Sequence, residues 1–283
     1  MPTFDTPHPV SATVELALGE VRITASERAD TVVDVRPSDA ANEADVKAAE
    51  ATHVDYANEK LVVKAPKTRP LIGARNNTGS IDVTIEVPAG SHLDGSGQMA
   101  DFHADGRLGD CRVRTGLGRV ELDRAGALHV KNGAGDVTVD RTTGHAEIVV
   151  GSGDVRLREL DGTAVIRNAN GDTWVGTAGG DTRVKSANGS IVVDRANASL
   201  AAKSANGDVR VAEAAHGSVV VETQIGDLEV GIREGTAAWL DVKAVAGHVR
   251  NELDSADAPP AASTDRVEVR ARTSVGDVVI RRA

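Results

Sequence analysis

The chain has 283 residues and a net charge of −10, with only two Trp, one Tyr and two Phe. So few aromatic side chains exclude a thick aromatic-rich core and call for thin layers of Val, Ile, Leu and Ala. The acidic charge argues against nucleic acid as a partner, because proteins that bind it carry a basic patch. The single cysteine, Cys111, excludes an intramolecular disulfide bond.

The first residues, MPTFDTPHPVSATVEL, contain no basic segment followed by an apolar one. No stretch of the chain approaches the roughly 18 apolar residues that span a bilayer. We therefore expect a cytoplasmic protein without a membrane span.

The first hundred residues predict a β-rich region with one short helix. Strands are expected within residues 10–36, at 61–66 (LVVKAP) and at 80–88 (SIDVTIEVP), the last two each stopped by a proline. Between them, NEADVKAAEAT at 42–52 favours a short, mildly amphipathic helix.

From about residue 109 onward, glycine recurs at a fixed stride. The spacing is nine from Gly135 to Gly189, and the series extends in both directions with small changes of step. A period sustained over this length indicates a repeat architecture. The series comprises Gly109, Gly118, Gly126, Gly135, Gly144, Gly153, Gly162, Gly171, Gly180, Gly189, Ala198, Gly207, Gly217, Gly226 and Gly235.

Apolar residues lie two and four places after most of these glycines, which predicts short strands with one buried face. The nine-residue units alternate between two kinds, so two units make one repeat, with two strands per coil of a parallel β-solenoid. An antiparallel meander is the alternative, but it would make every unit equivalent. Examples of the first kind are Val155/Leu157 and Ile191/Val193; the second kind includes Ala164/Ile166, Val219/Val221 and Ala237/Trp239.

The corner of the coil is marked by an Asn-Gly turn that recurs once per repeat. KSANG occurs at 185–189 and 203–207, and RNANG at 167–171. Glycine supplies the positive φ that a sharp turn needs. We expect Asn170, Asn188 and Asn206 to stack as a structural corner ladder, with their amides bonded along the coil axis.

The pattern predicts three segments within one all-β fold. Residues 1–100 form a β-rich N-terminal cap that is continuous with the solenoid and covers its strand edges. Residues 101–250 form the repeats. Residues 251–283 form a loop, DSADAPPAASTD at 254–265, and a final strand unit, VGDVVIRRA at 275–283.

Residues 82–123, which include IEVPAG at 85–90 followed by Gly-Asp units, resemble a bacterial family of β-strand repeat proteins. The family is known as "putative adhesin" and as a domain of unknown function, with an I-x-V-P-x-G strand end and G-D-V-x-V repeats. The resemblance extends from about residue 10 to the end of the chain. It implies a β-helix-like fold and no catalytic residues.

Two features suggest an interaction surface. Arg167, Lys185 and Lys203 recur once per repeat and predict a basic ladder for an acidic partner or polysaccharide; the alternative is a solvated face paired with nearby carboxylates. Trp174 falls at an outward position and would mark a contact. Trp239 is expected to point inward and close the last regular coil.

The sequence contains only weak candidates for metal-binding or catalytic residues. Aspartate follows the repeat glycine at Asp136, Asp154, Asp172, Asp208 and Asp227, which is displaced by one from the pattern of calcium-binding β-rolls and favours turn capping. The histidines show no metal-ligand spacing. Cys111 falls at an inward position, as a small buried hydrophobe does. We predict no catalytic, cofactor or metal residues.

These observations favour a non-enzymatic β-solenoid that binds an unknown protein or polymer partner and exists as a monomer or small oligomer. The alternative is an end-to-end polymerising scaffold, as in the bactofilins. A calcium-binding β-roll and a carbohydrate-active enzyme rank lower.

Overall fold

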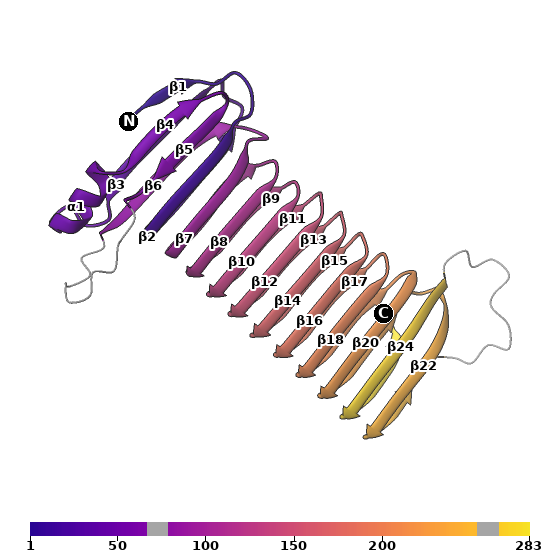
Figure 1. Cartoon of the computed structure of the whole chain (residues 1–283). Helices are drawn as coiled ribbons and strands as arrows, with labels where there is room; N and C mark the ends of the chain where they lie inside the picture. Colours follow the sequence, from indigo (N-terminus) through magenta and orange to yellow (C-terminus); the bar gives the residue numbers. More distant parts are fainter. Residues whose placement is uncertain (67–78, 254–265) are drawn as a thin grey trace. The chain divides into compact units, whose positions relative to one another are not determined.

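The computed structural model describes residues 1–66, 79–253 and 266–283 of the chain (Figure 1). These residues divide into two compact units, Met1–Val139 and Asp140–Ala283. In each unit, parallel β-strands stack in successive coils, which confirms the predicted all-β solenoid. The predicted loop at 254–265 lies outside the described residues.

In the first unit, each of two long strands covers the length of a whole coil, which two shorter strands share in the later coils. Strand β2 (Ser11–Ser26) lies parallel to β7 (His92–Arg107), with Val14 opposite Gly95 and Val21 opposite Phe102. Strand β8 (Cys111–Leu117) then pairs with the first half of β7, and β9 (Val120–Ala125) pairs with its second half. Strand β10 (Leu128–Ala134) pairs with β8, and β11 (Val137–Thr142) follows it along the chain.

The other side of β2 carries the remaining elements of the first unit. Strands β5 (Lys60–Lys64) and β6 (Ser80–Pro88) pair in parallel with the first and second halves of β2. Antiparallel strands then cover them: β4 (His53–Ala57) pairs with β5, β3 (Asp30–Pro37) with β6, and β1 (Thr3–Asp5) with β3. The strands expected at 61–66 and 80–88 are thereby confirmed.

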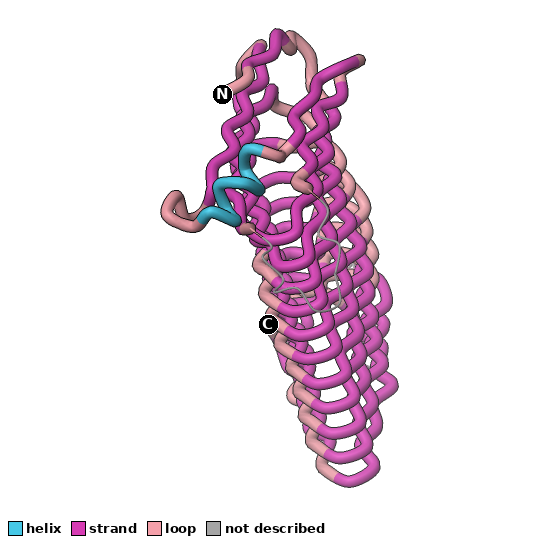
Figure 2. The backbone as a smooth tube through the Cα atoms, turned by 60° about the vertical axis from the view of Figure 1, so that its left-hand side comes forward, coloured by secondary structure: helices cyan, strands magenta, loops and turns pink. Residues whose placement is uncertain are grey.

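The expected helix is α1 (Glu43–Glu50), drawn in cyan in Figure 2, which packs beside β3 and β6. Its N-terminus is capped by Asn42, whose Oδ1 accepts a hydrogen bond from the N–H of Ala44 at 2.9 Å. The buried carboxylate of Asp45 accepts hydrogen bonds from the backbone N–H groups of Ser80 and Asp39, at 2.9 and 3.2 Å. These bonds fasten the helix to the start of β6.

In the second unit, each strand pairs in parallel with the strand one coil later, in a register that stays constant over most of the unit. Arg167 lies opposite Lys185, which lies opposite Lys203. Consecutive strands therefore belong to different sheets, which rules out the antiparallel meander. The first-strand sheet contains β12 (Ala146–Ser152), β14 (Ala164–Asn170), β16 (Thr182–Asn188), β18 (Leu200–Asn206) and β20 (Gly217–Ile225). The second-strand sheet contains β13 (Val155–Leu160), β15 (Thr173–Ala178), β17 (Ile191–Ala196), β19 (Val209–Ala214) and β21 (Leu228–Ile232).

At the end of the second unit, the order of coils differs from the order of the chain. Strands β24 (Arg266–Val275) and β25 (Val278–Arg282) pair directly with β20 and β21. The preceding strands, β22 (Ala237–Ala246) and β23 (Val249–Asn251), pair on the far side of β24 and β25. The last coil of the sequence is thus inserted between two earlier ones (Figure 1).

The core of the second unit consists of aliphatic side chains from both sheets. Ile148, Leu157, Ile166 and Ile191 are fully buried, as their places after the glycines predict. The prediction for Trp239 is wrong, because its side chain is 57% exposed. Leu240 lies opposite the buried Val269 and Trp239 opposite Glu268, so the inward frame of β22 is shifted by one residue.

The corner glycines adopt the backbone conformation that the Asn-Gly turn predicts. Gly189 has a φ of +137°, and a Cβ built on it would lie 2.1 Å from the carbonyl oxygen of Gly171. Such a contact leaves no room for a side chain. The turns of successive coils are therefore stacked backbone to backbone.

Candidate interaction surfaces

The predicted basic ladder exists on the outer face of the first-strand sheet. Arg167, Lys185 and Lys203 occupy equivalent places on β14, β16 and β18, and all three side chains are exposed. Arg167 pairs with Glu147 at 3.1 Å, and Lys203 pairs with Glu222 at 2.7 Å. Within the described residues, Lys185 has no ion-pair partner, so the middle of the ladder carries an uncompensated positive charge.

The basic character continues beyond the three predicted residues. Along the same row, Glu222 is followed by Arg272 on β24 and Lys243 on β22. Arg183 also lies on β16, two residues before Lys185, and is exposed. On this face the cations Arg167, Arg183, Lys185, Lys203, Arg266, Arg270, Arg272 and Lys243 outnumber the carboxylates Glu147, Glu222, Asp241 and Glu268. A chain of net negative charge thus presents one locally basic surface.

Trp174 does not join this surface. It lies on β15 in the second-strand sheet, in register with Arg156 and Val192, and is half-buried. A Cβ built on Gly176 would lie 3.2 Å from the edge of the indole, so the glycine leaves room for the ring. The sequence pattern could have predicted that Trp174 and Arg167 lie on different sheets. Trp174 belongs to the first kind of nine-residue unit, and Arg167 belongs to the second kind.

The three asparagines of the predicted corner ladder lie on the outside of the turn, and one of the expected bonds between their amides forms. Asn170, Asn188 and Asn206 lie in register on adjacent strands, and Nδ2 of Asn188 donates to Oδ1 of Asn170 at 2.9 Å. A second polar row, which sequence reasoning missed, lies two residues earlier and points inward. There, Nδ2 of Asn168 donates to the carbonyl oxygens of Gly153 and Gly171, both at 2.9 Å, and Ser204 donates to Gly189 at 3.1 Å. The sequence does carry a signal for this inward row, because a small polar residue recurs two places before the asparagine of each Asn-Gly turn, at Asn168, Ser186 and Ser204.

The aspartates that follow the repeat glycines cap the turns between coils. Oδ1 of Asp154 accepts from the N–H of Asp172 at 3.0 Å, and Oδ1 of Asp208 accepts from Asp227 at 2.8 Å. One oxygen of each carboxylate is therefore committed to the backbone one coil later, in agreement with the capping interpretation. Across the part of the chain that the structure describes, no group of three or more His, Cys, Asp or Glu residues is placed to hold a metal ion.

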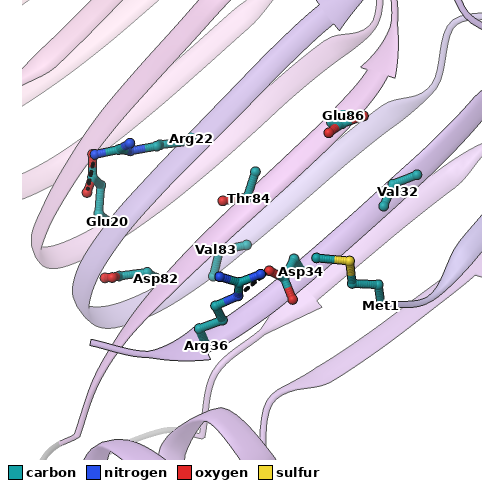
Figure 3. A pocket seen from close by; sticks show the side chains of 10 residues that line it. All are labelled: Met1, Glu20, Arg22, Val32, Asp34, Arg36, Asp82, Val83, Thr84 and Glu86. Atoms are coloured by element: carbon teal, nitrogen blue, oxygen red, sulfur yellow. Dashed lines mark hydrogen bonds and ion pairs between the residues drawn. The ribbon is translucent and has the colours of Figure 1, made fainter. Parts of the chain in front are cut away.

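A charged groove of about 390 Å³ lies on the first unit, over β2, β3 and β6 (Figure 3). Its guanidinium groups are paired within their own strands: Arg22 with Glu20 at 2.7 Å and Arg36 with Asp34 at 2.5 Å. Asp82 accepts a hydrogen bond from the hydroxyl of Ser38 at 2.7 Å. Most charged side chains that line the groove are thus already paired with neighbouring residues of this protein.

A neighbouring hollow on the same unit, of about 530 Å³, contains His103 on β7. Its Nε2 lies 2.9 Å from Asp105, and its Nδ1 lies 3.1 Å from Glu121. Partial burial lowers the pKa of the imidazole, but the hydrogen bonds to Glu121 and Asp105 outweigh that effect and raise the pKa above its ordinary value. The imidazole therefore bridges two carboxylates as a cation in acidic solution.

Cys111 points into the core, as its place two residues after Gly109 predicts. Burial raises the pKa of its thiol to about 12, with a smaller contribution from Asp110. The thiol is therefore protonated at neutral pH and unsuited to nucleophilic chemistry.

The strand pairings define a parallel β-solenoid with two strands per coil, two sheets and stacked turns. The chain belongs to the Toastrack DUF4097 family, which matches residues 13–281. This confirms the resemblance to a family of β-strand repeat proteins of unknown function. A search of curated proteins gave no match.

Several solved structures match nearly the whole chain at low sequence identity. A "putative adhesin" from Bacteroides fragilis is 10% identical with a TM-score of 0.36, and the match covers 99% of this chain and 95% of that chain. A "putative adhesin" from Parabacteroides merdae is 11% identical with a TM-score of 0.34, over 99% and 94%. A "putative cell adhesion protein" from Clostridium sporogenes is 9% identical with a TM-score of 0.26, over 100% and 98%.

The one helix among the described residues, α1, is too short to cross a membrane, and no other described segment is a candidate helical span.

Proposed function

We propose that the protein is a non-enzymatic binding protein that holds an acidic polymer on the outer face of its first-strand sheet. The observation that carries the proposal is the register of Arg167, Lys185 and Lys203 on adjacent strands. Neighbouring strands lie about 4.8 Å apart, so the three charges form a row of fixed spacing. The β-solenoid fold of the Toastrack family supports a binding role, since solenoids offer extended, repetitive faces.

The physical reason is the mutual repulsion of stacked cations. Glu147 and Glu222 compensate the outer two members of the row, while Lys185 and Arg183 remain exposed. A polyanion laid along the coil axis would bring its own negative charges to this row and relieve the repulsion. Contacts between exposed charges are screened by salt, so binding should weaken as the ionic strength rises.

The experiment measures binding of two labelled probes, dextran sulfate and poly-L-glutamate, by fluorescence anisotropy at low and moderate salt. We expect the double variant Arg183→Glu/Lys185→Glu to lose at least about ten-fold in affinity, since two favourable charges become repulsive. The matched control is Arg195→Glu/Arg210→Glu, which makes the same charge change on β17 and β19 of the second-strand sheet.

Preference for one probe would distinguish a sulfated polysaccharide from an acidic polypeptide. An equal loss of binding in both double variants would show that net charge alone decides binding and would contradict the proposal. Absence of binding by the unaltered protein to either probe at low salt would also contradict it.

A further inference from the structure

The strand β22 has an open edge with unusual side chains. Strand β24 pairs along one side of it, and no described strand is paired in register along the other. Trp239 on this strand is 57% exposed and Val245 is 72% exposed, and in β23 Val249 is 48% exposed. An open edge presents a row of unpaired N–H and C=O groups that a further strand can join. Exposed apolar residues next to such a row favour a protein partner.

The direction of the backbone groups fixes which residues of β22 could pair. The carbonyl oxygen of Ala246 accepts a hydrogen bond from the N–H of Gly276, so the backbone N–H and C=O of residue 246 point toward the coil of β24 and β25. Because these groups alternate from side to side along a strand, the odd-numbered residues turn theirs to the open edge. A new strand must therefore form its hydrogen bonds with residues such as Asp241 and Lys243.

The sequence of β22 is self-complementary about Val242 when read in the antiparallel direction. In the segment AAWLDVKAVA, Asp241 and Lys243 flank this centre, Leu240 and Ala244 come next, and Trp239 and Val245 follow. In an antiparallel pair of two such strands, Asp241 of each copy would lie opposite Lys243 of the other. Trp239 of each copy would lie opposite Val245, on the outer face.

We propose that a second copy of this chain occupies the edge of β22, in an antiparallel pairing centred on Val242. The same surface serves both copies, so the interface closes on itself and yields a dimer and not a filament. Registers centred one residue away would place Asp241 against Asp241 or Lys243 against Lys243, and like charges directly opposite are destabilising. The charge pattern thus selects one register among the neighbouring ones.

The local charges are consistent with this occupant. In the isolated chain, Arg272 on β24 pairs with Asp241 at 2.9 Å, and Lys243 lies in register with the same Arg272. Lys243 therefore has a like charge beside it and, within the described residues, no ion-pair partner. The Asp241 carboxylate of a second copy would supply that partner, and each Asp241 would then lie between Arg272 of its own chain and Lys243 of the other copy.

The experiment is sedimentation velocity of the full chain and of two single variants, Asp241→Lys and Lys243→Asp. We expect the unaltered protein to dimerise in a concentration-dependent way. Each variant alone should dimerise at least about ten-fold more weakly, because each places like charges opposite each other. An equimolar mixture of the two variants, one carrying a fluorescent label, should form a heterodimer, because every opposed pair is then of opposite charge.

A circular dichroism melt of each variant checks that it folds. An unaltered protein that stays monomeric at all concentrations, or that grows into filaments, would overturn the proposal. So would variants that dimerise alone as well as the unaltered protein, and so would folded variants that fail to combine in the mixture. Binding to the polyanion probes is a separate readout at β16, so failure of one proposal is distinguishable from failure of the other.

Discussion

The carboxylate of Asp172 accepts a hydrogen bond from the backbone N–H of Ser190 at 2.8 Å, and the two residues are one coil apart. In the same way, the carboxylate of Asp154 accepts a hydrogen bond from the N–H of Asp172, and that of Asp208 accepts one from the N–H of Asp227. Along the stacked turns, these aspartate carboxylates thus accept hydrogen bonds from the backbone N–H groups of the following coil. Ser190 interrupts the row of carboxylates, yet its N–H is still bonded by the preceding coil.

We predict that Asp172→Ala lowers the free energy of unfolding by about 1 kcal/mol, because it removes the acceptor of the Ser190 N–H in a stacked turn. Chemical denaturation followed by circular dichroism measures the change. Asp194→Ala serves as the control, since Asp194 lies on a strand of the same unit and accepts none of these turn bonds. Equal losses in the two variants would show that the capping bond contributes nothing specific.

Gly189→Ala should destabilise the protein strongly, by about 2 kcal/mol or more, because its Cβ would overlap the carbonyl oxygen of Gly171 at a positive φ. The control is Gly235→Ala. Gly235 has a φ of +77°, but no atom lies within 4 Å of a Cβ built there. That variant should therefore lose only about 1 kcal/mol from backbone strain. Comparable thermal melts for the two variants would contradict the stacked-turn geometry.

The His103 imidazole should titrate above its ordinary pKa of 6.5, since hydrogen bonds to Glu121 and Asp105 outweigh the effect of desolvation. A pKa raised in the folded state stabilises the fold fully below pH 6.5, and the stabilisation disappears as the pH rises through the folded-state value. His103→Gln should thus lower the melting temperature more at pH 5.5 than at pH 8.5, because the stabilisation is present at the lower pH and lost as the pH rises.

Nuclear magnetic resonance of the His103 ring protons measures this pKa directly. Glu121→Gln should lower the pKa, because the neutral amide no longer favours the imidazolium. Arg22 lies in register with His103 on β2, but its guanidinium is already engaged by Glu20. A titration midpoint at or below 6.5 in the unaltered protein would show that burial dominates instead.

Cys111 should resist thiol reagents in the folded protein, because burial raises the pKa of its thiol to about 12. Reaction with Ellman's reagent at neutral pH should be slower than that of a small free thiol by several orders of magnitude, since only the thiolate reacts. The same protein in guanidinium chloride should react at once. Rapid labelling under native conditions would mean that β8 opens readily.

Much of the solenoid could be predicted from the sequence because every coil repeats the same constraint. The glycine stride fixes the coil length, and the residues two and four places later, such as Val155 and Leu157, are buried as expected. The turn motif likewise predicts the outer row that contains Asn170 and Asn188. These features depend only on local periodicity, which a single chain displays.

The order of the coils could not be predicted from the same information. Strands β22 and β24 carry similar alternation, so the pattern does not say which of them pairs with β20. The inward row that contains Asn168 was missed because the adjacent Asn-Gly turn accounts for the motif without it. The frame of Trp239 was misassigned because Gly235 is followed by one extra residue before the inward positions begin at Ala238.

The insertion of the last coil between two earlier ones has a consequence for synthesis. As the chain leaves the ribosome, β22 and β23 emerge before the strands that will separate them from β20 and β21. The second unit therefore cannot be completed by adding coils in the order of translation, although N-terminal parts generally fold first. Residues 266–283 contact neighbours on both sides, so a nascent or nicked chain without them loses two interfaces at once. Completion of this end awaits residues 266–283, which follow β22 and β23 in the chain.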